Sequence, residues 1–400
     1  MSQMTKLRHR KNQLPFDIVL NILARLPVKS VTRFRCVCKS WDSSITTPYF
    51  ISTHLNHNKN HGNGCVIHMP SVRDTNPSSN TNRPVCTVAL DRPFDRISEI
   101  GVPFDFPNAC FQIVGSCNGL LCLANYGSST CANDIYLWNP SIRKFKKLPH
   151  TCLRQLRFVK LGFAYHSQNN DYKVVRISFS SFFLALALPL SLPLPLPLPE
   201  VEVYTLSSDS WRRVGIEFTT SVVNCPNDLS PAPLVSGALH WLAFVVEGEE
   251  NRKGKNMILS FDVNSEKFGK LELPNGSANT LQRCLSSFKG KLSFITSEHS
   301  EQPGFQFSIW ALREYGVVES WNKLFVVPSE RVACWISLID YGSLMVCYRN
   351  DPGERQGFKH ALIDIETLQE KKDPDIQHPS YITTFMESLV LLDGTNVESY

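Results

Sequence analysis

A glycine-anchored pattern recurs along the C-terminal two thirds of the chain: glycine, any residue, leucine, any residue, then an apolar residue. Its copies begin at Gly119, Gly237, Gly290 and Gly342, so the intervals are 118, 53 and 52 residues, and 118 is twice 59. Self-similarity at a fixed period of tens of residues is the sequence signature of repeat architectures, in which each copy is one supersecondary unit. The pattern therefore restricts most of the chain to an array of similar units.

A second mark accompanies these units. It consists of a short alternating segment, a polar turn and an aromatic residue, as in 135–138 with Phe145, 201–204 with Trp211, 258–261 with Phe268, and 307–310 with Trp321. Period-two alternation bounded by turns, such as 139–141 and 207–209, predicts antiparallel strands. The 25 prolines, against 20 glycines, suit short strands joined by turns. Units of about four strands fit the blades of a β-propeller, which protects its strand edges by radial repetition.

Five such units run from about 112 to 372. We expect a further blade that joins residues 389–392 near the C-terminus to early strands near Val66 and over 85–90. The prediction is six blades, with five or seven as alternatives.

The N-terminal segment has a different periodicity. Three short helical stripes precede residue 50, and they place apolar residues at Ile18, Val19, Ile22, Leu23 and Leu26, at Val28, Val31 and Phe34, and at Val37, Cys38, Trp41 and Ile45. Pro27 and Pro48 end the first and third stripes, because proline lacks the N–H that a helix interior needs. Each helix is shorter than the roughly 12–15 residues needed for independent stability, and the unit is too small for a self-sufficient core. The segment is predicted to be a docking module.

The positive charge gathers in the same segment. Residues 1–60 hold ten Lys and Arg against two acids, a net of +8, and the remaining residues carry 31 − 34 = −3. A nucleic-acid-binding protein usually spreads basic residues over its reading surface, so this distribution disfavours that class.

The N-terminal segment resembles an F-box. The similarity rests on Leu14-Pro15, Ile18, the run from Ile22 to Val31, and Phe34-Arg35-Cys36-Val37-Cys38-Lys39-Ser40-Trp41. Residues 115–122 (GSCNGLLC), 137–141 (LWNPS) and 161–163 (LGF) are similar to the plant F-box-associated domain, a kelch-like propeller; the chain lacks the Gly-Gly pairs of kelch repeats. The resemblance implies a substrate-recognition subunit of a Skp–cullin–F-box ubiquitin ligase, which is not itself an enzyme.

The resemblance also implies which residues contact the acidic Skp-family adaptor. They are Leu14, Pro15, Ile18, Ile22, Leu23, Leu26, Pro27, Val28, Val31, Val37, Cys38 and Trp41. The adaptor would connect the chain to the cullin scaffold, and the propeller would bind an unknown target protein for ubiquitination and degradation. The sequence identifies no target-binding residues, but the polar, glycine-containing loops 125–134, 166–171, 246–256, 298–304 and 349–358 are candidate tips.

The expected organisation has four parts. These are a basic tail over 1–12, the helical module of three short helices over 13–55, a linker over 56–64, and the propeller over 65–395. The propeller carries a Leu/Pro-rich insertion at 182–199, whose five prolines argue against a membrane-spanning helix or an interior strand.

Two short motifs suggest chemistry at first sight. Residues 115–119 (GSCNG) have the outline of a nucleophile elbow with Cys117, but such an elbow needs a following helix, and a strand-like segment follows here. His54, His57, His61 and Cys65 have metal-like spacing in an Asn/Gly-rich stretch that offers little support for a zinc site. We therefore expect no metal, no cofactor and no catalytic residue.

The 13 cysteines include no C-x-x-C pair, and the polar N-terminus is not a secretory signal, so a reducing cytoplasmic or nuclear location is expected. Two alternatives remain at this point. One is a glycan- or protein-binding propeller that acts outside a ligase, and the other is a propeller hydrolase that uses Cys117.

Overall fold

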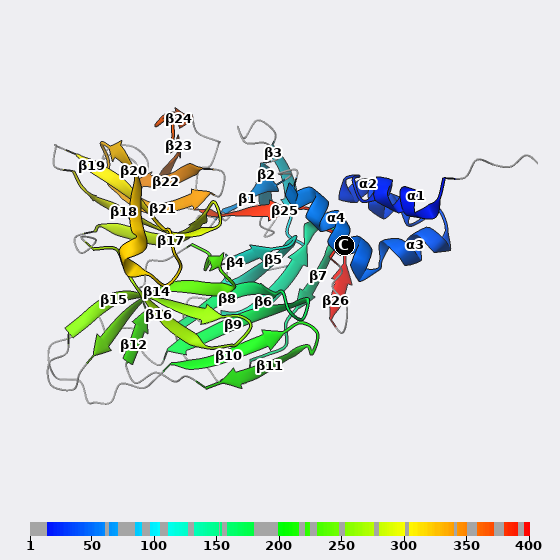
Figure 1. Ribbon diagram of the computed structural model, residues 1–400, viewed down its shortest axis with the longest axis horizontal. Helices are drawn as coiled ribbons and strands as arrows, with labels where there is room; N and C mark the ends of the chain where they lie inside the picture. The colour runs from blue at the N-terminus through cyan, green and yellow to red at the C-terminus, as the bar shows by residue number, and fades with distance from the viewer. Residues whose placement is uncertain are drawn as a thin grey trace, which may run out of the picture.

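The computed structural model describes residues 14–60, 64–70, 85–89, 97–104, 111–126, 132–151, 153, 158–179, 199–215, 221–224, 230–247, 253–275, 280–300, 304–339, 342–349, 358–371, 380–390 and 396–400. The predicted tail over 1–12 lies outside these residues, as does the predicted insertion at 182–199 except for its last residue. Figure 1 shows a helical module, residues 14–60, at one side of a larger all-β body.

The described strands form six antiparallel sheets. Three are built on strands from residues 64–214, and two of these three also take a strand from residues 380–399. They contain β25 (Ser380–Met386), β1 (Gly64–Pro70), β2 (Val85–Ala89) and β3 (Ile97–Gly101); β4 (Phe111–Cys117), β5 (Leu120–Tyr126), β6 (Ala132–Asn139), β7 (Lys144–Lys147) and β26 (Val397–Ser399); and β8 (Phe158–His166), β9 (Asp171–Phe179), β10 (Glu200–Thr205) and β11 (Ser210–Val214).

The other three sheets follow in chain order. They contain β12 (Ser221–Asn224), β13 (Leu234–Val235), β14 (Ala238–Glu247), β15 (Lys253–Asp262) and β16 (Phe268–Glu272); β17 (Gln282–Phe288), β18 (Lys291–His299), β19 (Phe305–Leu312) and β20 (Trp321–Ser329); and β21 (Ala333–Ile339), β22 (Ser343–Arg349), β23 (Phe358–Asp364) and β24 (Glu370–Lys371).

The six sheets close into a ring. Strands β4, β8, β14, β17, β21 and β25 contact one another in that order, and β25 returns to β4. This cyclic order is the arrangement of a β-propeller. Five sheets are built on meanders of consecutive strands, and the remaining sheet joins β25 to β1, β2 and β3 from the other end of the chain. The structure therefore has five blades built on consecutive strands rather than the six predicted, and the composite sheet closes the ring between the first and last of them.

The prediction that residues 389–392 form the strand that closes the ring was wrong. The C-terminal partner of β1 is β25, which pairs in register from Gly64 opposite Met386 to Pro70 opposite Ser380. Leu389, in the segment predicted for this role, is outside any strand and is buried against the helical module. The apolar Leu389 side chain therefore makes a contact between the propeller and the helical module.

Turn chemistry explains the glycine repeat. Asn118-Gly119, Ser236-Gly237 and Lys289-Gly290 are two-residue hairpin loops in which both residues have positive φ. A type I′ turn requires this conformation, and glycine adopts it at least cost. The leucine of the pattern is the second residue of the next strand, and it is buried at Leu121, Leu239 and Leu292.

A second turn recurs between the third and fourth strands of three sheets. The side-chain oxygens of Asn139, Asp262 and Asp364 accept hydrogen bonds from the backbone N–H two residues later, at 3.0, 3.1 and 3.1 Å. In each case the residue four positions after this cap, Arg143, Glu266 or Leu368, has a positive φ. The three turns have the same capping hydrogen bond, and only in the first does an amide side chain, rather than a carboxylate, supply the capping oxygen.

The helical module has four helices rather than the three predicted: α1 (Phe16–Leu23), α2 (Val28–Phe34), α3 (Lys39–Ile45) and α4 (Pro48–Asn60). Pro48 begins a helix, because proline is tolerated at the first helical position, where its missing N–H is not needed. Helix α4 also covers residues 56–60 of the predicted linker. Among the described residues, no helix combines the length and apolar character needed to cross a bilayer.

Candidate functional site

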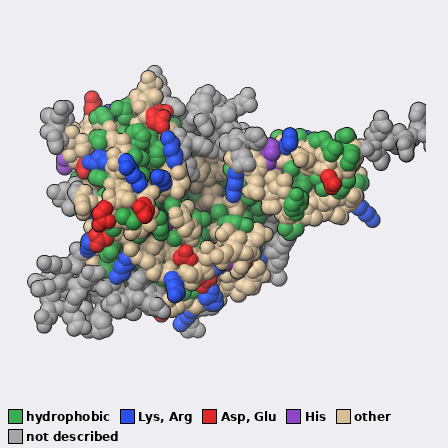
Figure 2. Space-filling model, viewed as in Figure 1, with side chains coloured by type: hydrophobic (Ala, Val, Ile, Leu, Met, Phe, Trp, Pro, Cys, Tyr) green, Lys and Arg blue, Asp and Glu red, His purple; other side chains and the backbone are tan. Residues whose placement is uncertain are grey.

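The helical module carries an apolar surface. Ile18 and Ile22 lie one turn apart on α1, Leu14 lies just before the helix, and these three side chains, which we call the exposed apolar stripe, are 47–59% exposed. Phe16, Val37 and Tyr49 are also exposed, and these six make up nearly half of the thirteen exposed large hydrophobic side chains among the described residues. Figure 2 shows hydrophobic side chains on the outer part of the module. Such a concentration on a small unit is typical of a binding surface.

The structure divides the twelve residues of the expected adaptor contact. Leu14, Pro15, Ile18, Ile22, Pro27, Val37 and Cys38 are exposed, and Leu26 and Trp41 are half-buried. Leu23, Val28 and Val31 are buried in the module's core with Ile45 and Phe50. These three residues are therefore corrected from surface to core positions, because four short helices need them to pack against one another.

Sequence reasoning missed two exposed residues of this surface. Tyr49 is 78% exposed in the first turn of α4, a helix that was not predicted, and Phe16 is 40% exposed at the start of α1. Phe16 stands in the N-terminal motif, between Pro15 and Asp17, and only its exposure identifies it.

Exposed cations accompany the apolar surface. Arg25, Lys29, Arg33 and Lys39 are exposed on the module, and Asp17 is an exposed acid. Arg35 and Asp42 pair at 2.7 Å, but both are more than a third exposed, so the pair contributes little to stability. The cations favour an acidic partner through long-range attraction.

The module is joined to the propeller by residues 387–390, which follow β25. The Leu389 side chain is 3% exposed and lies in the module's core with Leu23, Val31 and Phe50. On the propeller side, Asn139 Nδ2 donates to the Ser388 carbonyl oxygen at 3.2 Å and to that of Val390 at 2.9 Å. We call residues 387–390 the clasp, because they contact both modules.

Further hydrogen bonds hold the clasp and α4. The Glu387 carboxylate accepts from the backbone N–H of Val28, the first residue of α2, and Asn58 Nδ2 donates to the Glu387 carbonyl oxygen at 3.4 Å. His54 is buried in α4 and its Nε2 lies 2.8 Å from the Leu26 carbonyl oxygen, so this nitrogen carries the proton. Burial lowers the pKa of His54 and keeps the ring neutral.

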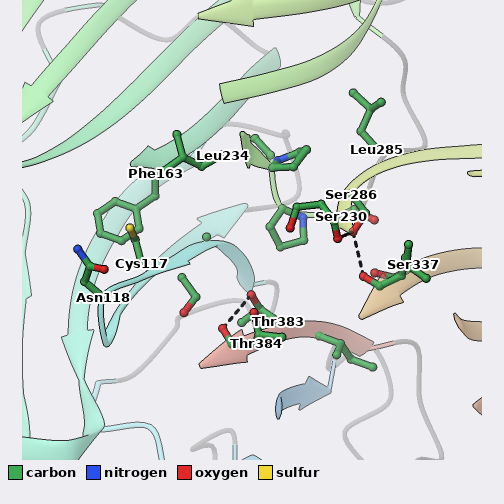
Figure 3. Close-up of a pocket in the computed structure, with 18 residues that line it drawn as sticks. Cys117, Asn118, Phe163, Ser230, Leu234, Leu285, Ser286, Ser337, Thr383 and Thr384 are labelled. Carbon is green, nitrogen blue, oxygen red and sulfur yellow. Dashed lines mark hydrogen bonds between the residues drawn. The ribbon is translucent and has the colours of Figure 1, made fainter. Parts of the chain in front are cut away.

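A cavity of about 300 Å³ lies where the inner strands of the ring converge. Its lining comes from all six sheets and includes Ser116 of β4. Figure 3 shows Ser286 of β17, Ser337 of β21 and Thr383 of β25 around it. None of its lining residues is Asp, Glu, Lys, Arg or His. The cavity thus offers hydroxyls and backbone groups and no charged side chain.

The predicted hairpin at residues 115–119 is confirmed. Cys117 ends β4 and pairs with Leu120 of β5 across the two-residue turn, so no helix follows the cysteine. Packing around the thiol raises the pKa of Cys117 to about 11, which keeps it protonated near neutral pH. A thiol in this state is a poor nucleophile.

Two of the four residues with metal-like spacing, His54 and Cys65, have other roles in the structure. His54 is committed to Leu26, and Cys65 lies on β1 as a buried residue whose pKa burial raises to about 12. In the part of the chain that the structure describes, no group of three His, Cys, Asp or Glu side chains is arranged to hold a metal ion. His61 lies outside the described residues.

The candidate loops divide between the two faces of the ring. Loops 125–134, 246–256, 298–304 and 349–358 contain connections between second and third strands, counted outward from the ring centre, and they leave the face opposite the clasp. Loop 166–171 joins a first strand to a second, like Asn118-Gly119, so it lies on the clasp face. The tips of the first four loops lie outside the described residues.

Comparisons with known proteins agree with this architecture. The family model described as "F-box domain" matches residues 12–53, and the model described as "F-box associated beta propeller domain" matches residues 61–347. An F-box/kelch-repeat protein of Arabidopsis thaliana is 26% identical over 345 residues, covering 82% of this chain and 83% of its own. The F-box protein CPR1 of Arabidopsis thaliana is 27% identical over 336 residues, covering 80% and 74%.

Among solved structures, an α-L-arabinanase of Penicillium chrysogenum covers 77% of this chain and 95% of its own, with 11% identity and a TM-score of 0.42. That likeness is too low to support any argument about function. The family descriptions together span the helical module and most of the ring. The chain belongs to the plant F-box proteins that carry an F-box-associated β-propeller domain.

Proposed function

We propose that this chain is the substrate-recognition subunit of a Skp–cullin–F-box ubiquitin ligase. The observation that supports the proposal most directly is the exposed stripe of Leu14, Ile18 and Ile22 on a helical module whose opposite side is already packed on the propeller. An isolated apolar stripe of this kind is stabilised by a partner, and the surrounding cations favour the acidic Skp-family adaptor.

In this proposal, the propeller binds a target protein through the face opposite the clasp. Four of the five candidate loops leave that face, which supports a target site away from the junction with the helical module. The adaptor connects the chain to the cullin, and the ubiquitin-conjugating enzyme supplies the chemistry. The chain acts by raising the effective concentration of the target near that enzyme, in the cytoplasm or nucleus.

The adaptor contact is tested by replacing Ile18 and Ile22 together with serine in the full chain. Loss of two buried apolar side chains from an interface is expected to weaken Skp-family adaptor binding by roughly a hundredfold or more. The matched control replaces Leu324 and Val326, an exposed apolar pair on β20, with serine, and adaptor binding should be unchanged. Calorimetry or surface plasmon resonance with purified adaptor gives both affinities.

Unchanged adaptor affinity in the Ile18→Ser, Ile22→Ser variant contradicts the proposal and favours a binding propeller that acts outside a ligase. The target is approached by affinity capture from cells with the proteasome blocked, using wild type and the same variant. Partners of the propeller should appear with both baits, whereas adaptor and cullin should appear with wild type alone. Ubiquitin transfer to a shared partner, dependent on Ile18 and Ile22, completes the assignment.

A further inference from the structure

Asn139 differs from its counterparts in the repeated turn. Asp262 and Asp364 cap the equivalent turns with a carboxylate, which can only accept hydrogen bonds. Asn139 makes the same cap through Oδ1, to Ser141 N–H at 3.0 Å, so its amide nitrogen is not needed for the turn. That nitrogen instead donates to the carbonyl oxygens of Ser388 and Val390. A residue with both an acceptor and donors is needed here because it performs two tasks.

The two acceptors flank Leu389. Asn139 is buried and holds the backbone on both sides of this residue, while the Leu389 side chain enters the core of the helical module. Ile142, three residues after Asn139, packs against the same core. The propeller therefore supplies part of the helical module's interior, from a position more than 300 residues later in the chain.

Glu387 connects the clasp to the module a second time. Its carboxylate accepts from the N–H of Val28, and its carbonyl oxygen accepts from Asn58 of α4. Helices α2 and α4 are thus both attached to one residue that directly follows β25. Two modules joined by a single linker reorient freely by default, whereas contacts of this kind oppose rotation.

We propose that the clasp makes the F-box and the propeller one rigid body and that Asn139 is the positioning residue that sets their relative orientation. This inference rests on the proposed function for its purpose: a fixed orientation holds the bound target at a defined direction from the adaptor. Effective concentration is greatest when the connection between two binding sites matches the span that they must bridge.

The test uses Asn139→Asp in the full chain. Aspartate has the same shape and can keep the cap to Ser141, but it loses both donors and brings a carboxylate oxygen toward two carbonyl oxygens. The matched control is Asp364→Asn, which keeps the acceptor of the equivalent turn and belongs to a different sheet, at the end of β23. Leu389→Ala is the second variant, because it removes the side chain from the module and leaves the hydrogen-bonding backbone in place.

The readout is the distance distribution between spin labels on p-acetylphenylalanine at Tyr49 of the F-box and Leu368 of the propeller, measured by double electron–electron resonance. Both positions are exposed, and this chemistry avoids the chain's cysteines. Wild type and Asp364→Asn should give one narrow distribution. Asn139→Asp and Leu389→Ala should broaden it by about twofold or more, as expected when interdomain contacts no longer oppose motion.

Thermal unfolding of the propeller, measured alongside, shows that each variant is folded. A distribution as narrow as that of wild type in a folded Asn139→Asp or Leu389→Ala protein overturns the inference. The result is independent of the adaptor, since it is obtained on the chain alone. Failure of wild type to bind the Skp-family adaptor would therefore contradict the proposed function, and the width of the distance distribution would still decide the role of the clasp.

Discussion

Gly119 lies directly against Ser388. A Cβ atom on residue 119 would overlap the Ser388 side chain and would lie 2.7 Å from the Met386 carbonyl oxygen. The glycine also has φ of +80°, so two independent requirements exclude a side chain at this position. One turn of the propeller is thus shaped by the chain that leads into the clasp.

Gly119→Ala should lower the free energy of unfolding by about 2–4 kcal/mol, because it adds steric overlap to the cost of a positive φ. Gly290→Ala is the matched control, since Gly290 has φ of +75° in the same type of turn and open space around its Cβ position. It should cost only about 1 kcal/mol. Denaturant unfolding measures both, and equal losses would show that Ser388 does not crowd residue 119.

Stability should fall as the pH is lowered from about 6.5 toward 4, in part because of His240. This ring is 1% exposed, its Nδ1–H donates to the Pro233 carbonyl oxygen at 3.2 Å, and Nε2 accepts from the Tyr315 hydroxyl at 2.7 Å. Burial lowers the pKa of His240 to about 4. The unfolded chain therefore takes up the proton first, and the stabilisation that is present above pH 6.5 is lost as the pH falls, by up to roughly 3 kcal/mol.

His240→Gln should be less stable than wild type near pH 7.5 and should lose less stability on acidification. The burial that lowers the pKa values of His54 and His166 acts in the same direction and supplies a residual slope. Denaturation curves at pH 7.5, 6, 5 and 4.5 measure the difference. Parallel stability curves for variant and wild type would contradict the role of His240.

Glu202→Gln should destabilise the propeller by about 3–5 kcal/mol, because it leaves a buried guanidinium without its counter-charge. Arg176 and Glu202 face each other on β9 and β10 at 3.1 Å with side chains 3% and 0% exposed, and Glu202 also accepts from Leu153 N–H. Glu272→Gln, which breaks the half-exposed Lys255–Glu272 pair, should cost less than about 1 kcal/mol. Similar losses would mean that the buried pair is not stabilised by its charges.

Thiol reagents should modify Cys36 and Cys38 in the native protein well before Cys117. Both are exposed, whereas the pKa of Cys117 is raised to about 11, so its thiolate fraction near pH 7.5 is at least about a hundredfold below that of an ordinary cysteine. Timed alkylation followed by peptide mass spectrometry orders the sites. Early labelling of Cys117 would reopen the hydrolase alternative.

The sequence predicted those parts of the fold that local chemistry determines. The glycines were recognised because they recur at regular intervals, and they recur because each type I′ turn needs one; the helical stripes were recognised because their period is local. The apolar run at 389–392 was predicted to be a strand, yet Leu389 packs on a module that lies more than 300 residues away in the chain. No local pattern contains that contact.

The apolar surface shows a similar limit. Along α1, Ile18 and Ile22 are exposed, while Leu23 is buried beside them in the same apolar run. Periodicity shows that the helix has apolar faces, but only tertiary packing decides which face contacts the module's own core. For this reason Leu23, Val28 and Val31 were placed on the surface, and Phe16 and Tyr49 were not considered.

The two ends of the chain depend on each other in a way that affects synthesis. The helical module is synthesised more than 300 residues before Leu389, so its interior is incomplete until that residue is made, and β1 lacks its partner β25 for nearly as long. A chain released before residue 380 therefore has an open ring and an incompletely filled helical core. Synthesis of residues 380–390 is in this sense a structural precondition for a finished F-box.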